Sequence, residues 1–117
     1  MKLREAPFTA IRDGQKRYEL RLYDEKRKKI RVGDTIRFVH NEEGERTLLC
    51  RVTSIAHYPT FDALYAALPL FELGYREEEI EAASPQDMEC YYEKEEIATY
   101  GVIAIGLALV ANNDYRK

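Results

Sequence analysis

The feature that most constrains the fold is an almost unbroken apolar stretch near the end of the chain. It reads VIAIGLALV, covers residues 102–110 and follows Gly101 directly. The stretch is far shorter than the ~20 apolar residues that a helix needs to cross a bilayer. A strand this apolar is typical of one that is covered on both sides, and it is unsuited to a sheet edge. The sequence therefore predicts an interior strand here.

Three more segments have strand patterns. Tyr18, Leu20 and Leu22 alternate with polar residues, which predicts a strand with one apolar and one polar face. A turn at Gly33 and Asp34 leads into a second strand, and a loop over residues 41–45 then leads into a long third strand over residues 47–58. The irregular apolar pattern of that long strand suggests a bulge.

Helix signals lie between and after these strands. Residues 7–14 read as a short helix that starts with proline and stops at glycine. Thr60 is suited to cap a helix over residues 61–68, and Ser84 is suited to cap one that runs from about residue 85 to 100. The stretch between them, residues 69–83, reads as irregular and acidic. The total is four or five strands and three helical segments, which predicts an α+β, mainly β fold or a small barrel.

Length and composition narrow the class of protein. A chain of 117 residues suits one domain over residues 1–117. The two cysteines, Cys50 and Cys90, lack metal-ligand spacing and read as two buried thiols rather than a disulfide. No export signal is visible at the start. We therefore expect a cytoplasmic protein without a membrane span, a metal or a cofactor.

Charge is distributed unevenly along the chain. The net charge is −3, made up of +5 over residues 1–58 and −8 over residues 59–117. One interpretation is that the two halves attract each other. The other is that a local basic patch on an acidic protein steers a phosphate-bearing ligand, since each charge acts over only about 8–10 Å. Both stay open at this point.

The segment before and within the first alternating strand carries a motif, Gly14-x-Lys16-x-x-Glu19-x-Arg21. With the later Val32-Gly33-Asp34-x-Ile36-x-Phe38 turn and strand, it resembles the ASCH family, a branch of the PUA-like superfold. The resemblance implies a PUA-like small β-barrel with flanking short helices and a cleft beside the motif. It also implies binding of RNA or a modified nucleoside. Some members resemble amidohydrolases that deacetylate acetylcytidine, and one branch is ribonuclease-like.

The deacetylase-like members of that family use a lysine, a threonine three residues later and a distant glutamate. Lys16 matches the lysine, whereas Glu19 stands where the threonine would be. The distant glutamate corresponds to Glu81, with residues 77–79 as competing positions. If the chain is an enzyme, Lys16 and Glu19 are the expected catalytic pair.

The side chains of the motif suit an anionic ligand that carries a base. Lys16 can reach a phosphate or act as a base, Glu19 can accept a proton or a base amino group, and Arg21 can hold phosphate with its planar fork. Tyr23 shares the polar face of that strand and is a candidate for base stacking. On a convex surface the same residues would be an ordinary solvated face.

A basic run follows that strand and consists of Lys26, Arg27, Lys28 and Lys29. It is either a solvated loop or a source of sequence-independent phosphate contacts. The sequence thus predicts a module that binds RNA, a nucleotide or a modified nucleoside. A hydrolase acting on a modified nucleoside or on RNA is the alternative. A domain whose charge only maintains solubility is a third reading.

Overall fold

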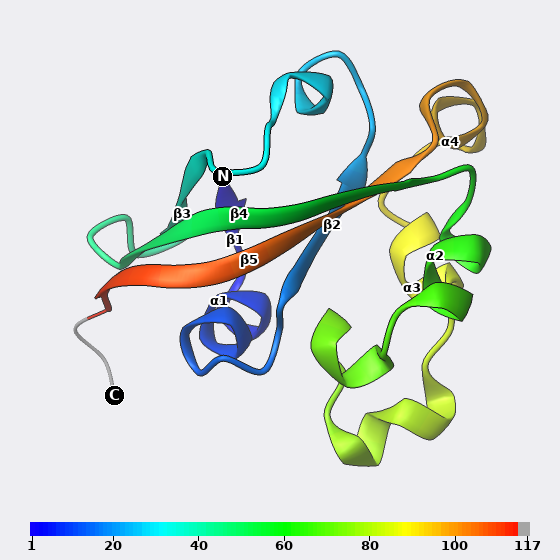
Figure 1. Ribbon diagram of the computed structural model, residues 1–117. Helices are drawn as coiled ribbons and strands as arrows, with labels where there is room; N and C mark the ends of the chain where they lie inside the picture. The colour runs from blue at the N-terminus through cyan, green and yellow to red at the C-terminus, as the bar shows by residue number, and fades with distance from the viewer. Residues whose placement is uncertain (115–117) are drawn as a thin grey trace.

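Five strands form one sheet in the computed structural model, which describes residues 1–114. The strands are β1 (Lys2–Leu3), β2 (Tyr18–Leu22), β3 (Thr35–His40), β4 (Thr47–Tyr58) and β5 (Val102–Asn113). Their order across the sheet is β1-β3-β4-β5-β2. β1 pairs in parallel with β3, and the other neighbours are antiparallel. Figure 1 shows β4 and β5 as a long, twisted pair in the middle of the molecule.

The apolar stretch forms the first part of β5, and it lies between β4 and β2 as an interior strand should. Residues Val102, Ile103, Ala104 and Ile105 are all buried. The expectation of cover on both sides is wrong for the second part, where Leu109 and Val110 are exposed. Pairing between β2 and β5 ends at Tyr18 and Gly106, because the chain before β2 turns away toward the first helix.

The predicted long strand, its bulge and the hairpin before it are confirmed. β4 spans Thr47–Tyr58, and its register with β5 shifts between Leu49 and Cys50 and again between Val52 and Ser54. The turn at Gly33 precedes β3, and the glycine has φ of 96°, a left-handed conformation that favours glycine. β1 was not predicted, since two residues carry no periodicity.

In the described part of the chain, four α-helices and three 3₁₀ turns accompany the sheet. The helices are α1 (Glu5–Arg12), α2 (Phe61–Ala67), α3 (Gln86–Glu89) and α4 (Lys94–Tyr100), and the turns are Arg27–Lys29, Leu70–Leu73 and Glu77–Ala82. α1 begins two residues before the predicted Pro7. α2 begins as predicted, because the hydroxyl oxygen of Thr60 accepts a hydrogen bond from the Ala63 amide at 3.1 Å.

The single helix predicted from residue 85 to 100 is wrong, since α3 and α4 are separate. The chain leaves the helical path after Cys90, and Tyr92 packs its ring 6.0 Å from that of Phe61. Glu93 then starts a new helix, with its amide donating to the Glu96 carboxylate at 3.2 Å. We attribute the break to two interactions that one continuous helix would not make: the ring contact of Tyr92 with the core, and the cap that Glu93 provides for α4. The acidic stretch predicted to be irregular contains the last two 3₁₀ turns.

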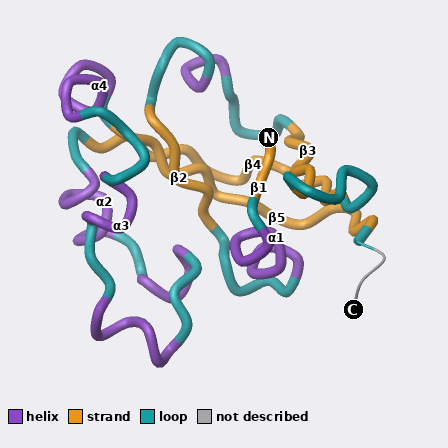
Figure 2. The backbone as a smooth tube through the Cα atoms, turned by 180° about the vertical axis from the view of Figure 1, so that it is seen from behind, coloured by secondary structure: helices purple, strands orange, loops and turns teal. Residues whose placement is uncertain are grey.

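The helices cover two separate regions of the sheet, as seen from behind in Figure 2. At one end, α2 packs Phe61 and Leu64 against Leu20 and Leu22 of β2. In the middle, α1 packs Phe8 and Ile11 in a cluster with residues of β3 and β4. Two hydrophobic clusters therefore hold α1 and the segment that begins with α2 on either side of the start of β2.

The α+β class is confirmed, although helix and strand content are about equal rather than mainly β. Closure into a barrel is not confirmed by strand pairing, since β1 and β2 stand at opposite ends of the strand order. A side chain links these two ends, because Arg21 donates from Nη2 to the carbonyl oxygen of Lys2 at 3.3 Å. One domain over residues 1–117 stays a prediction, and residues 115–117 lie outside the described part.

The two cysteines are both free thiols, as predicted. Cys50 is buried in β4, and burial raises the pKa of its thiol to about 11. Cys90 is exposed, so the expectation of two buried thiols is wrong for it; the residue lies where the chain leaves α3. Within residues 1–114, none of the helices has the length and apolar character that spanning a membrane requires.

A buried ionic cluster, which the sequence did not reveal, fastens the end of β5 to α1. Arg46 is fully buried and donates from Nε to Asp114 Oδ1 at 2.7 Å and from Nη1 to Glu5 Oε1 at 2.8 Å. His40 is also buried, and its Nε2 lies 2.9 Å from the same Glu5 oxygen. Its Nδ1 accepts the backbone amides of Glu42 and Glu43, so Nε2 carries the proton that bonds Glu5.

Candidate functional site

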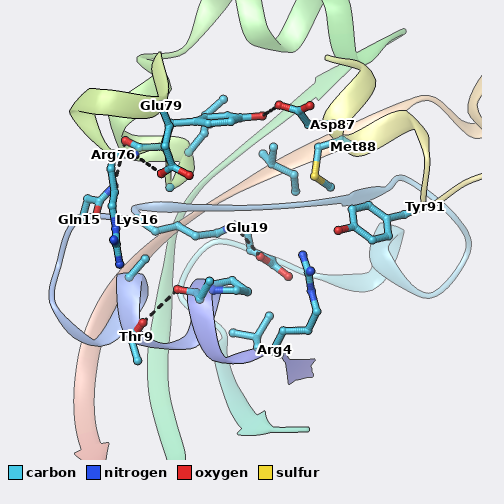
Figure 3. Close-up of a pocket in the computed structure, with 18 of the residues that line it drawn as sticks. Arg4, Thr9, Gln15, Lys16, Glu19, Arg76, Glu79, Asp87, Met88 and Tyr91 are labelled. Atoms are coloured by element: carbon cyan, nitrogen blue, oxygen red, sulfur yellow. Dashed lines mark hydrogen bonds and ion pairs between the residues drawn. The ribbon is translucent and has the colours of Figure 1, made fainter. Parts of the chain in front are cut away.

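A pocket of about 850 Å³ lies between α1, the start of β2 and the segment from Leu73 to Tyr92. Pockets of this size are typical of small-molecule sites. Figure 3 shows side chains from α1 and from the segment after α2 pointing into it from opposite sides. The pocket is thus a product of the two hydrophobic clusters, which hold its two walls apart.

The charged residues of the motif form one wall, where Glu19 lies between two cations. Lys16 Nζ is 3.4 Å from Glu19 Oε1, and Arg21 Nε donates to Glu19 Oε2 at 2.8 Å. The Glu19 side chain is only 5% exposed. Because its neighbours Leu20 and Leu22 are also buried, this part of β2 is enclosed on both faces. The three residues therefore converge on a concave surface, and the reading as a solvated convex face is not supported.

Lys16 is placed by backbone contacts on both sides of the pocket. Its amide donates to the Ala10 carbonyl at 3.0 Å, and the amide of Arg17 donates to the Glu72 carbonyl at 2.8 Å. The aliphatic stem of Lys16 lies against Gly74, where a methyl group would approach its Cδ to 3.3 Å. Gly74 has φ of 112°, so glycine serves both the turn and the close approach.

The opposite wall carries a chain of hydroxyl groups that ends on a carboxylate. Tyr75 donates to Asp87 Oδ2 at 2.7 Å, and its oxygen is 2.8 Å from the Tyr65 hydroxyl. Since the single Tyr75 proton goes to Asp87, Tyr65 is the donor in the second bond. Burial, followed by the bonds to Tyr65 and Asp87, raises the pKa of Tyr75 far above its ordinary value. Both hydroxyls therefore stay protonated at neutral pH and act as fixed polar groups.

One of the acidic residues in the second half of the chain reaches the pocket. Glu79 is among the lining residues, whereas Glu77, Glu78 and Glu81 are not. The Glu79 carboxylate accepts the Arg76 amide at 2.8 Å, which fixes it at the start of the 3₁₀ turn (Figure 3). Of the four glutamates that the sequence left as candidates, Glu79 is therefore the one that lines the pocket, and its role stays a prediction.

The remaining candidate residues lie outside the pocket lining. Tyr23 places its ring 4.3 Å from that of His57. The basic run follows β2, at the opposite end of that strand from Lys16 (Figure 1). Arg27 is paired with Asp24 at 3.0 Å, and Lys28 Nζ lies 3.4 Å from Glu25. The structure does not bring this run together with Lys16, Glu19 and Arg21, and its role in ligand binding stays a prediction.

Charge from the basic run nevertheless extends toward one end of the pocket. Burial raises the pKa of Tyr92, a lining residue. The charges of Arg21 and Glu19 in the pocket act on this group, and so does that of Arg27 outside it. Asp24, the ion-pair partner of Arg27, acts on the same group in the opposite direction.

Several pocket residues gave no signal in the sequence. Arg4, Tyr75, Asp87 and Tyr91 come from distant elements, and no spacing relates them to the motif. In the described residues, no group of three or more histidine, cysteine, aspartate or glutamate side chains is placed to hold a metal ion. What the pocket offers is an ionised wall facing an aromatic one, an arrangement suited to a flat ring with a polar edge.

Comparison with known proteins gives a family and a fold. The family model of the ASCH domain matches residues 1–111. The crystal structure of a hypothetical protein is similar with a TM-score of 0.74 and 28% identity, over 94% of this chain and 96% of that one. The solution NMR structure of a protein from Pyrococcus furiosus has a TM-score of 0.62 and 27% identity, over 94% and 98%. No curated protein matches significantly.

Proposed function

The chain belongs to the ASCH domain family, and from this membership and the geometry of the pocket we propose that it binds a nucleoside or one unpaired nucleotide of RNA. The observation that carries the proposal is Glu19, a buried carboxylate held between Lys16 and Arg21 at the pocket wall. A buried ion triad is not built for stability, since apolar residues of similar volume serve at least as well. Its value lies in presenting fixed charge to a ligand.

The sign of that charge selects the ligand. An ionised Glu19 repels a polyphosphate but accepts a hydrogen bond from a base amino group or a sugar hydroxyl. Arg21 and Lys16 on either side attract a single phosphate. The wall therefore suits a base-bearing ligand of low charge better than a bare polyphosphate. Lys26, Arg27, Lys28 and Lys29 would then contact the backbone of a longer RNA that leaves the pocket near Arg21.

Replacing Glu19 with glutamine tests the proposal, because it removes the charge and keeps the shape. We expect Glu19→Gln to weaken binding of ribonucleosides by about tenfold or more, as for a lost charge-assisted hydrogen bond. Binding of an abasic ribose phosphate should change little. Isothermal titration calorimetry measures both. Glu25→Gln is the matched control, since Glu25 is exposed and, within residues 1–114, its one ion pair is with Lys28 outside the pocket.

Two results would contradict this proposal. Equal losses for the nucleoside and the abasic phosphate would mean that Glu19 only positions Arg21. Absence of binding to nucleosides and to short single-stranded RNA, even at low salt, would contradict nucleic-acid recognition as a whole. In the proposed mode, affinity for RNA falls with rising salt concentration more steeply than affinity for a nucleoside, because only the RNA releases counterions.

A hydrolase acting on a modified nucleoside is a second candidate, and it is favoured by one observation. Glu79 lines the same pocket as Lys16, so a lysine and a glutamate are available there for the roles that these two residue types have in the deacetylase-like relatives. In this reading Lys16 stabilises developing negative charge, and Glu79 or Glu19 transfers a proton. Because Glu19 stands where these relatives have threonine, the hydroxyl group of that threonine is missing from this pocket.

Incubation with acetylcytidine and with RNA, followed by chromatography of the products, tests for this activity. If the pocket is catalytic, Lys16→Ala and Glu79→Gln each lower the rate by at least about a hundredfold, the scale of one acid–base group. Glu81→Gln serves as the control, since Glu81 is outside the pocket lining. A rate that survives both pocket substitutions would assign the activity to a contaminant or another site.

A further inference from the structure

Among residues 1–114, four tyrosines line the pocket, and three of them already have aromatic partners. Tyr92 packs on Phe61 in a stacked arrangement with 6.0 Å between the rings. Tyr65 and Tyr75 meet edge to face, and their hydroxyls form the chain that ends on Asp87. These three rings are therefore structural parts of the wall, because each already packs against another aromatic ring.

Tyr91 differs from the other three because it is exposed at the pocket mouth. Tyr91 follows α3 closely in the chain, and the residue is 54% exposed. The contact recorded for its ring is with Arg4, whose guanidinium carbon lies 5.2 Å from the ring centre. Tyr91 is the pocket tyrosine whose ring contacts an exposed charged side chain rather than another ring.

Arg4 reaches this ring from the opposite wall. It is the residue before α1, it is exposed, and within residues 1–114 its side chain forms no hydrogen bond or ion pair. Figure 3 shows Arg4 rising from the α1 side toward Tyr91, with Met88 above them. The Arg4–Tyr91 contact therefore spans the pocket mouth and joins two walls that are distant in sequence.

This contact is easily replaced by a ligand. A cation over an exposed aromatic ring is held more weakly than a nucleobase stacked on the same ring. The guanidinium that a base displaces keeps all its donors, and its fork matches a phosphate group. Met88 beside the ring has a flexible, polarisable side chain that adapts to rings of different size.

Resting on the proposed function, we propose that Arg4 and Tyr91 form a clamp in which Tyr91 stacks the base of one unpaired nucleotide and Arg4 binds its phosphate. In the free protein the two residues close on each other. In the complex the base takes the place of the guanidinium on the Tyr91 face. The clamp thus adds a stacking subsite and a phosphate subsite to the polar contact at Glu19, so that base, sugar and phosphate are each recognised.

A fluorescent reporter tests the stacking directly, because the chain contains no tryptophan. In Tyr91→Trp, we expect ribonucleoside 5′-monophosphates to quench the tryptophan emission at the concentrations at which calorimetry detects binding. Phe71→Trp is the matched control, since Phe71 is also exposed, at 49%, and lies outside the pocket lining. Its emission should not change. Binding detected by calorimetry without quenching in Tyr91→Trp would overturn the clamp.

Affinity measurements separate the two subsites. We expect Tyr91→Ala to weaken nucleosides and their monophosphates alike by about tenfold, whereas Tyr91→Phe stays close to the wild type. Arg4→Gln should weaken the monophosphates about tenfold and should not weaken the nucleosides, since the base no longer has to displace a guanidinium. Both residues are exposed, so neither change is expected to unfold the protein. Circular dichroism of each variant is the measurement that checks this.

The outcomes distinguish the clamp from the function on which it rests. If Glu19→Gln weakens nucleoside binding while Tyr91→Ala and Arg4→Gln do not, the clamp is wrong and the proposed function stands. If the wild-type protein binds neither nucleosides nor their monophosphates, both are wrong. Arg4→Gln could also weaken nucleosides and nucleotides equally. That result would contradict the proposed phosphate contact of Arg4, but not the stacking on Tyr91.

Discussion

At the scale of single residues, the pocket depends on side chains held by one or two specific contacts. Glu19 is fixed by Lys16 and Arg21, and Tyr75 is fixed by Tyr65 and Asp87. Such preorganisation keeps donors and acceptors in place before a ligand arrives, which lowers the entropy that binding would otherwise cost. A change that shifts one contact should therefore weaken binding without unfolding the protein.

Gly74 provides a test of that expectation. Alanine there has to adopt a left-handed φ of 112° and brings a methyl group to 3.3 Å from Lys16 Cδ. We expect Gly74→Ala to lower the free energy of unfolding by about 1–2 kcal/mol through backbone strain. Because the Lys16 stem has to move, we also expect nucleoside affinity to fall several-fold. Urea unfolding and calorimetry measure the two effects.

Gly33→Ala is the matched control for this experiment. Gly33 also has a left-handed φ, of 96°, but a methyl group there would meet no atom within 4 Å. It should show a similar loss of stability with unchanged ligand affinity. If both alanine variants bind the nucleoside as the wild type does, contact with Gly74 does not position Lys16.

At the scale of elements, α1 serves both the pocket and the stability of the sheet. The residue before it is Arg4 of the proposed clamp, and its first residue, Glu5, enters the buried ionic cluster with Arg46 and His40. Hydrogen bonds from Arg46 and then His40 lower the pKa of Glu5 to about 2 from its ordinary value of 4.5. The cluster thus couples the position of α1, and with it one pocket wall, to the ionisation of one carboxylate.

The cluster predicts a specific pH dependence of stability. Because the folded state holds Glu5 in its charged form, its contribution is complete above pH 4.5 and is lost as the pH falls toward about 2. We expect Glu5→Gln to be less stable than the wild type at pH 7, and the difference between the two proteins should shrink over this pH window. Urea unfolding at several pH values measures it.

Other carboxylates also titrate in this window, so the comparison requires a control variant. Glu25→Gln removes an exposed carboxylate whose one ion pair within residues 1–114 is with Lys28, and it should stay parallel to the wild type across the whole range. A difference between Glu5→Gln and the wild type that is the same at pH 7 and near pH 2 would show that the cluster does not depend on the charge of Glu5.

At the scale of the whole molecule, the basic first half and the acidic second half of the chain place residues of opposite charge on the two sides of the pocket. Lys16 and Arg21 of the basic half face Glu79 and Asp87 of the acidic half across the pocket. Arg46 of the first half is bound to Asp114 of the second. The Arg46–Asp114 pair therefore supports attraction between the two halves, and a site for a charged ligand at the pocket stays a proposal.

Local sequence determined the elements whose residues interact within a few positions of one another. The alternation at Tyr18, Leu20 and Leu22, the Thr60 cap and the apolar stretch after Gly101 each predicted their element, because periodicity and capping depend on local geometry. The motif also placed Lys16, Glu19 and Arg21 on and just before one strand. It did not determine whether that strand faced solvent or a pocket.

Only the tertiary structure decided that question, because the second wall of the pocket comes from the segment between Leu73 and Tyr92. Tyr75, Glu79 and Tyr91 approach the motif through packing of α2 against β2, which no local pattern encodes. The same holds for the split between α3 and α4, where a ring contact of Tyr92 overrides helix continuity, and for the burial of Arg46. A sequence specifies short-range geometry directly, whereas contacts between distant segments depend on how all the apolar faces pack at once.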